Sequence, residues 1–268
     1  MKLRGHLLVV IGLMTGAVLS AEASLSEQTK TFAYSDWSSI LERVVDDRGL
    51  VDYHALAADT EALDRVIAGI EAVSPRSHPE RFAEPNQALA YYINAYNALV
   101  FRGVLDKGPE IETVWGRSGT GLGFFVRRKH RVGGEKISLK KFEDLWVREG
   151  FRDPRIHAAL NCASAGCPRL PRVPFSPDTL DSELDEAMTE FVSSPRNVRV
   201  DEAARVVTLS KIFDWFKRDF LDFEAEQGVE RPTVIDYVNR YRDSPRPIPR
   251  DYRVEFEKYD KRLNRQPR

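Results

Sequence analysis

Apolar residues recur at helical spacing along much of the chain and predict a helix-rich fold. The first such stretch runs from Trp37 to Val44, with Asp36 as a candidate cap, and a second runs from Leu56 to Ile70. The clearest pattern begins at Pro85 and continues to about Leu105. Between the first two stretches, residues 50–53 form a short extended piece. The first hundred residues therefore predict three helices in succession.

Serine, threonine and proline signals mark the helices in the rest of the chain. Ser138 and Ser210 precede apolar periodic stretches, and Ser176 is followed by Pro177 at a first helical turn. The predicted helices are 139–146, 177–191, 211–220 and 233–241.

Shorter segments with strand character lie between these helices. Residues 124–126 and 131–132 are predicted to be extended, with a glycine turn at 133–134 leading to a second strand. Residues 156–161 also predict a strand. The remaining extended segments are a hairpin formed by 197–200 and 206–209, and a last strand at 252–259. Together the elements predict an α+β fold, a helix-rich single domain over residues 24–268 around a small antiparallel sheet.

The first 23 residues resemble a cleaved secretory signal. Lys2 and Arg4 precede an apolar run from Leu7 to Leu19, and small residues follow at Ala21 and Ala23. The run is shorter than the roughly 20 residues that span a bilayer, and no later segment is long and uncharged enough to do so. We therefore expect a periplasmic or secreted protein without a membrane span after cleavage.

The charge balance and the missing motifs exclude several function classes. The whole chain has 40 basic and 41 acidic residues, so no excess of positive charge favours nucleic acid as a partner. The sequence has no dinucleotide or phosphate-binding glycine loop, no serine nucleophile elbow and no zinc-protease motif. We accordingly expect no cofactor.

Both cysteines of the chain lie within ten residues of a histidine. The segment 153–168 contains His157, Cys162 and Cys167. If residues 156–161 form a strand, Cys162 belongs to its apolar face and would be buried and unreactive, while His157 and Asn161 share the other face. Cys167 lies between Gly166 and Pro168, where it is predicted to cap a helical turn whose backbone dipoles favour the thiolate.

This pattern suggests a cysteine hydrolase in which Cys167 is the nucleophile, His157 the acid or base, and Cys162 a reserve nucleophile. Such an enzyme also needs a polar group that orients the histidine. Asn97 and Glu143 are the candidates for that role. Asn94, Tyr96 and Asn161 are candidates for contacts with the substrate.

Other interpretations of the cysteines remain open. In an oxidising compartment, Cys162 and Cys167 are first of all candidates for a structural disulfide. A metal site that includes His157 lacks a second pair of ligands with suitable spacing, and a disulfide oxidoreductase lacks the C-x-x-C spacing. Asn94 and Asn97 lie on an apolar helix and are expected to be buried, where they could equally serve a structural hydrogen-bonding role.

Several ordered motifs resemble the family known as domain of unknown function 547. These motifs are 49–53, 92–99, 132–139 with Glu143, 153–168, 209–216 with 219–220, and 259–264. The histidine and cysteine pattern of the family is similar to that of transglutaminase-like and papain-like cysteine hydrolases. The resemblance therefore implies a possible papain-like fold and a peptidase or amidase that acts on peptide or cell-envelope substrates. The alternative is a periplasmic binding or assembly module without enzymatic activity, in which Cys162 and Cys167 form a structural disulfide.

Overall fold

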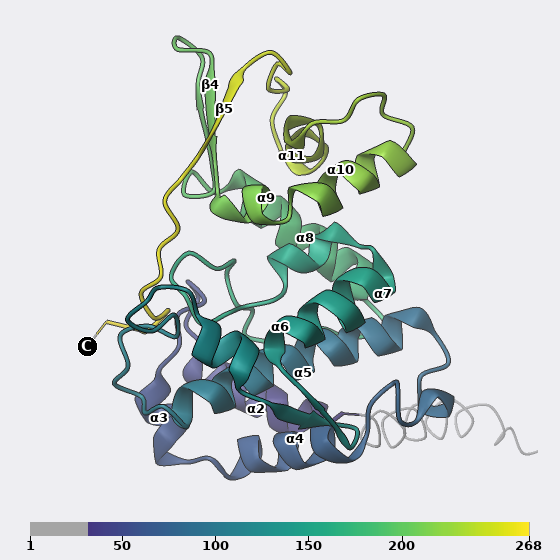
Figure 1. Ribbon diagram of the computed structural model, residues 1–268, viewed down its shortest axis with the longest axis vertical. Helices are drawn as coiled ribbons and strands as arrows, with labels where there is room; N and C mark the ends of the chain where they lie inside the picture. The colour runs from purple at the N-terminus through teal and green to yellow at the C-terminus, as the bar shows by residue number, and fades with distance from the viewer. Residues whose placement is uncertain (1–31, 268) are drawn as a thin grey trace, which may run out of the picture.

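The longest helix lies at the centre of the larger half of the molecule (Figure 1). The computed structural model describes residues 32–267. Helix α5 (Pro85–Leu105) begins with proline in its first turn, and Glu84 and Gln87 form a reciprocal capping box at its start. From Leu89 to Val104 nearly every side chain is buried, so α5 packs on all sides instead of exposing one face.

Shorter helices and one hairpin surround α5. Strands β1 (His130–Val132) and β2 (Glu135–Ile137) form the antiparallel hairpin, joined by the predicted glycine turn. The helical segments of this half are α2 (Tyr34–Val44), α3 (Tyr53–Ala58), α4 (Glu61–Ala72), η1 (Pro79–Arg81), η2 (Leu122–Arg127), α6 (Leu139–Lys141), η3 (Phe142–Arg148), α7 (Glu149–Phe151) and η4 (Pro154–Ala158).

The second half is built from later residues and lies above the first in Figure 1. Strand β4 (Val206–Leu209) pairs antiparallel with β3 (Val198–Asp201) and parallel with β5 (Arg253–Phe256). Its helices are α8 (Leu180–Ser193), α9 (Lys211–Trp215), α10 (Lys217–Glu226) and α11 (Val234–Tyr241). After β5 the chain returns to the first half, where residues 263 and 265 make isolated bridges to Ser164 and Val51.

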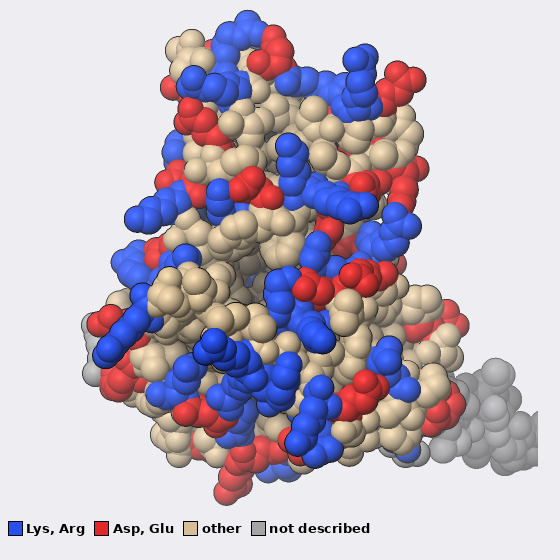
Figure 2. Space-filling model, viewed as in Figure 1, with Lys and Arg blue, Asp and Glu red and all other residues tan. Residues whose placement is uncertain are grey.

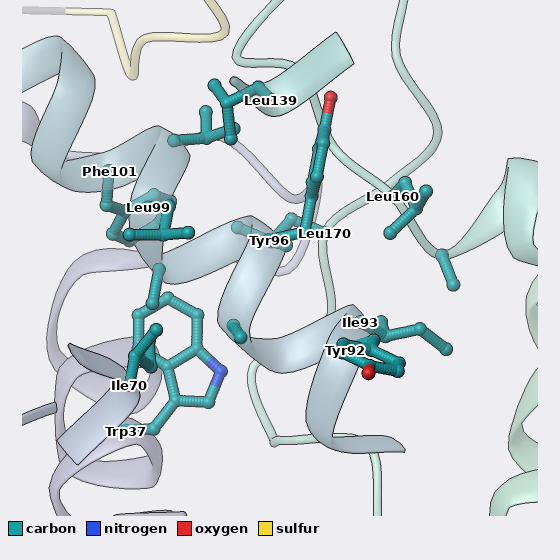
Figure 3. Packing of buried hydrophobic residues seen from close by; sticks show 14 of the residues in the cluster. Trp37, Ile70, Tyr92, Ile93, Tyr96, Leu99, Phe101, Leu139, Leu160 and Leu170 are labelled. Atoms are coloured by element: carbon teal, nitrogen blue, oxygen red, sulfur yellow. The ribbon is translucent and has the colours of Figure 1, made fainter. Parts of the chain in front are cut away.

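Two hydrophobic clusters correspond to these halves. The first surrounds α5, and Figure 3 shows part of it, including Trp37 and Phe101, whose rings are 5.2 Å apart. The second lies under the three-stranded sheet and includes Phe213, Phe220 and Tyr237. Helix α8 contributes Leu184 to the first cluster and residues closer to its C-terminal end to the second, so it links them.

Most predicted elements are confirmed, and the α+β class is correct. The central helix, the two hairpins, the last helix and the caps at Ser138 and Ser210 lie where the sequence places them. The sheet is not purely antiparallel, because β5 joins β4 in the parallel direction. The predicted helix from Leu56 to Ile70 is in fact α3 and α4, separated at Asp59 and Thr60.

Other boundaries were wrong for local reasons. Asp36 lies inside α2 and pairs with Arg65 instead of capping the helix. Helix α8 begins at Leu180, three residues after Pro177. The predicted helix 211–220 is interrupted at Phe216, which separates α9 from α10.

Two predicted extended segments are helical. Residues 124–126 belong to the π-helix η2, which starts after Gly121. Gly121 has a φ of +67°, and a Cβ there would lie 2.6 Å from the Phe125 ring. Residues 156–158 belong to the 3₁₀ helix η4, so the alternating faces predicted for a strand at 156–161 do not exist. Pro168 likewise opens no helical turn.

Within residues 32–267, no helix has the length and apolar character needed to cross a membrane. The predicted signal sequence, residues 1–23, lies outside the described residues.

Candidate functional site

A cavity of about 490 Å³ lies between the two halves of the molecule. Figure 2 shows it as a hollow near the middle of the face seen in Figure 1. Both cysteines, His157, Glu143 and Tyr96 line it, so five of the predicted site residues come together. The two π-helical segments also contribute, η2 with Phe125 and Val126 and η3 with Glu143 and Arg148. Because π-helical turns are rare and are frequent at functional sites, their convergence here favours a functional cavity.

The two cysteines form one corner of this cavity. Their sulfur atoms are unbonded and 2.6 Å apart, and the Cys162 backbone N–H donates to the Cys167 sulfur at 3.0 Å. The Tyr259 hydroxyl lies 3.2 Å from each sulfur. Cys162 is partly exposed, contrary to the strand-based prediction, whereas Cys167 is buried.

Hydrogen bonding divides the charge of this pair unequally. Burial opposes ionisation of Cys167, but hydrogen bonds from the Cys162 thiol, the Tyr259 hydroxyl and the Cys162 backbone outweigh it and lower the pKa of Cys167. The hydrogen bond to Cys167, together with burial, raises the pKa of Cys162. The pair therefore carries its first negative charge on Cys167, for a different reason from the helical turn that the sequence suggested.

A strained loop holds the cysteines in place. Ala163 adopts the left-handed conformation with a φ of 61°, which costs free energy for a residue with a Cβ. Gly166 packs so closely on Tyr259 that a Cβ would lie 2.8 Å from the ring. Its backbone N–H also donates to the Asp260 carbonyl. The loop thus depends on the returning C-terminal segment for its shape.

Buried amides support the same loop from inside the first half. Asn97 accepts the Asn161 backbone N–H at 2.9 Å and donates to the Ala159 carbonyl at 3.1 Å. Asn161 accepts the Ala163 N–H and donates to the Pro168 carbonyl. Asn94 binds the Phe175 backbone, farther along the chain. None of these three asparagines lines the cavity described above, so the structure does not place Asn94 or Asn161 where a substrate would contact them. Asn97 does not orient His157, because Asp219 is the partner of the imidazole.

The histidine forms a second corner of the cavity, in contact with Phe220 of the second cluster. His157 Nε2 lies 2.7 Å from Asp219 Oδ2, and Arg148 binds both oxygens of the same carboxylate, at 2.7 and 2.8 Å. The imidazole stacks on Phe216 with ring centroids 4.0 Å apart. Asp219 is therefore the group that orients His157, a role predicted from the sequence for Asn97 or Glu143.

Charge and burial fix the protonation of this corner. Burial opposes ionisation of Asp219, but hydrogen bonds from His157 and Arg148 prevail and hold its pKa well below the usual range. Burial lowers the pKa of His157 even though Asp219 acts in the opposite direction. At neutral pH the corner holds an aspartate, an arginine cation and a neutral imidazole.

Glu143 lies on η3 and also lines the cavity. Its carboxylate accepts a hydrogen bond from the Tyr96 hydroxyl at 3.4 Å. Burial raises the pKa of Glu143 from 4.5 to about 7. Such a group can both give and take a proton near neutral pH.

The part of the chain that matches a protein-family model contains most of this cavity. Residues 80–192 match the family model described as "Protein of unknown function, DUF547". This region belongs to the DUF547 family. The match includes Tyr96, Glu143, His157 and both cysteines, whereas the motifs recognised at 49–53, 209–216 and 259–264 lie outside it. No curated protein and no solved structure matches the chain.

Three important residues were missed as site residues. Arg148 lies within the DUF547 region, but Asp219 and Tyr259 come from later parts of the chain. The sequence did contain a signal for Asp219, because it is an acidic residue between Phe216 and Phe220 in a predicted helix whose other face is largely aromatic. In the described part of the chain, no group of three or more histidine, cysteine, aspartate or glutamate side chains converges to bind a metal ion.

Proposed function

We propose that this protein is an exported, thiol-dependent hydrolase that forms an acyl-thioester on Cys167. The observation that carries the proposal is the Cys167 sulfur, which accepts the Cys162 N–H and contacts Tyr259 in the same cavity as the His157–Asp219 pair. A thiolate, an oriented histidine and a proton donor are the groups that such chemistry requires. The proposed substrates are peptides or cell-envelope components with an amide bond.

We propose a separate role for each group, and the electrostatics of the cavity support it. The Cys167 thiolate attacks the substrate carbonyl, and the tetrahedral intermediate collapses to an acyl-thioester while the leaving amine takes a proton from Glu143. His157 Nδ1, the ring nitrogen that Asp219 does not hold, then accepts a proton from the water that attacks the thioester. The product acid and the Cys167 thiolate result, and His157 returns its proton to Glu143 through solvent. A neutral imidazole suits the role of base, and a carboxyl with a pKa of about 7 suits the role of acid.

Alkylation and acyl transfer test this assignment together. Iodoacetamide should label Cys167 of the reduced protein at pH 6, where an ordinary thiol with a pKa of about 8.5 reacts slowly. A pulse of p-nitrophenyl acetate should leave an acetyl group on the same residue, detected by peptide mass analysis. Cys167→Ser should abolish both signals, and Cys162→Ser should retain the acetyl-enzyme. Tyr259→Phe should slow labelling at pH 6 about tenfold, because it removes one hydrogen bond to a charged group. Acetylation that survives in Cys167→Ser would exclude the proposal.

A second candidate is the non-enzymatic module with a Cys162–Cys167 disulfide. The 2.6 Å separation of the two sulfurs favours it, because oxidation would need little movement. Protein isolated without reductant would then resist alkylation even when unfolded. Each single cysteine substitution would lower stability equally, with no added loss in the double variant. Labelling of Cys167 in native protein isolated without reductant would exclude this alternative.

A further inference from the structure

Three cationic side chains line the cavity, and they differ in their partners. Lys140 pairs with Asp144, and Arg148 pairs with Asp144 and Asp219. Lys261 has no carboxylate partner among residues 32–267. Two of the three positive charges are therefore neutralised within the protein, and Lys261 is left to interact with a ligand.

Lys261 is nevertheless held in a defined position. Its ammonium donates to the Gly119 carbonyl at 2.8 Å and lies 5.1 Å from the centroid of the Trp115 ring. The backbone of the same residue accepts a hydrogen bond from Thr113. Because these contacts already restrict the side chain, binding of an anion would cost little additional conformational entropy.

A second cavity, of about 520 Å³, adjoins the first at this lysine. Trp115, Gly119, Tyr259 and Lys261 line both cavities. The second cavity also contains Lys258 and Arg262 against the acidic Glu112 and Asp260, and Asp260 is bound to Arg262. A substrate with its reacting carbonyl at Cys167 can therefore extend past Lys261 into a space in which basic side chains outnumber acidic ones.

The wall of the first cavity supplies an apolar surface beside this lysine. Trp215 and Val126 line the cavity and remain 42% and 40% exposed, and the Trp215 ring lies 4.7 Å from that of Tyr259. Exposed apolar side chains at the rim of a cavity are typical of surfaces that a ligand covers.

We infer that Lys261 binds a carboxylate of the substrate, and that the substrates are peptides with an apolar residue followed by a carboxylate. The inference rests on the proposed function, because it deepens the assignment of the same cavity. The carboxylate can belong to an acidic side chain or to a free C-terminus, and Lys261 recognises the chemistry that the two share.

Binding to the inactive Cys167→Ser variant tests this without any turnover. The probes are three acetylated dipeptides: Phe-Glu amide, Phe-Gln with a free C-terminus, and the neutral Phe-Gln amide. Binding is followed by tryptophan fluorescence, since Trp115 and Trp215 line the cavity. One or both anionic probes should bind about tenfold more tightly than the neutral one, as expected for a charge-assisted contact at a partly solvated site. The probe that shows the preference identifies the source of the carboxylate.

Second-site variants assign the effect to Lys261. Lys261→Met should remove the preference for the anion, and Lys261→Arg should retain most of it. Lys136 is an exposed lysine on β2 outside the cavity, so Lys136→Met is the matched control. It should leave the binding of all three probes unchanged. Equal binding of all three probes, or a preference that survives in Lys261→Met, would overturn the inference.

This outcome can be separated from failure of the proposed function. If Lys261→Met loses the preference for the anionic probes but the native protein forms no acetyl-enzyme, the cavity binds carboxylates and the hydrolase proposal fails. An acetyl-enzyme with no preference among the probes would retain the hydrolase and exclude the role of Lys261.

Discussion

The two hydrophobic clusters contribute different chemistry to the cavity that they share. The first cluster supports the cysteine loop through Ala163 and Leu170, and its residues include Tyr96. The second cluster contains Ala158, the neighbour of His157, and Phe220, whose ring is 5.3 Å from that of His157. The thiol corner therefore packs mainly against the first cluster and the histidine corner mainly against the second, and they are linked by Ile156, which belongs to the first cluster, and Tyr259, which packs against the second.

This difference has a consequence for reactivity. Among residues 32–267, no hydrogen bond joins His157 to either sulfur. The thiolate is stabilised by its own loop and Tyr259, independently of the histidine. A substrate must bridge the two corners, so variants can affect one corner without the other.

The largest expected effect is the loss of turnover when the histidine corner is disrupted and the thiol corner is left intact. Asp219→Asn removes the carboxylate that fixes the imidazole and pairs with Arg148, so turnover of p-nitrophenyl acetate should fall by about 10³-fold. Alkylation of Cys167 at pH 6 should keep its wild-type rate. If the alkylation rate falls as far as turnover does, the two corners are coupled and the comparison fails.

Paired truncations of the two clusters should have similar energetic cost but different effects on His157. Phe220→Ala and Phe101→Ala each remove a fully buried ring and should cost about 3–5 kcal/mol of unfolding free energy, measured by urea denaturation. Only Phe220→Ala opens space beside the imidazole, so only this variant should raise the pKa of His157 in an NMR titration. A matching rise in Phe101→Ala would show that the clusters do not act separately.

A smaller effect, on folding stability at acidic pH, should come from His130 on β1. Burial, with help from Arg128, lowers the pKa of His130 from 6.5 to about 4. Between pH 6.5 and 4, His130 is protonated in the unfolded chain but remains neutral in the folded protein. The free energy of unfolding therefore falls as the pH drops from 6.5 towards 4, by up to about 3 kcal/mol from this group.

His130→Gln should remove that part of the acid sensitivity. The pKa of His157 is lowered as well, and this residue remains in the variant, so part of the loss of stability at acidic pH should persist. Urea midpoints at pH 7, 5.5 and 4 measure the difference. Parallel curves for the two proteins would show that His130 titrates normally.

Local sequence signals determined much of the fold. Proline at the first turn and the Glu84–Gln87 box define the start of α5. Ser138 and Ser210 define the starts of their helices because each side chain accepts a backbone N–H from the first turn. Glycines 133 and 134 both have positive φ and form the turn that the sequence predicted. These features depend on residues within a few positions of each other, so a single sequence contains the necessary information.

The segment 156–161 shows where local patterns fail. Its alternation of apolar and polar residues fits a strand, but Asp153 caps a 3₁₀ turn there by accepting the Arg155 N–H. Within residues 32–267 no strand pairs with this segment. In so short a segment, the tertiary environment decides between conformations of similar local energy.

The sequence alone determined that His157, Cys162, Cys167 and Glu143 were candidates for one site, because their chemistry and spacing are visible in the chain. Only the tertiary structure decided that Asp219 orients His157 and that Tyr259 hydrogen-bonds the sulfurs, since these partners are 62 and more than 90 positions away. It also decided that Asn97 supports a backbone segment instead of the histidine. The reason is physical: a pKa depends on which groups burial and packing bring within a few ångströms, and those neighbours come from distant parts of the chain.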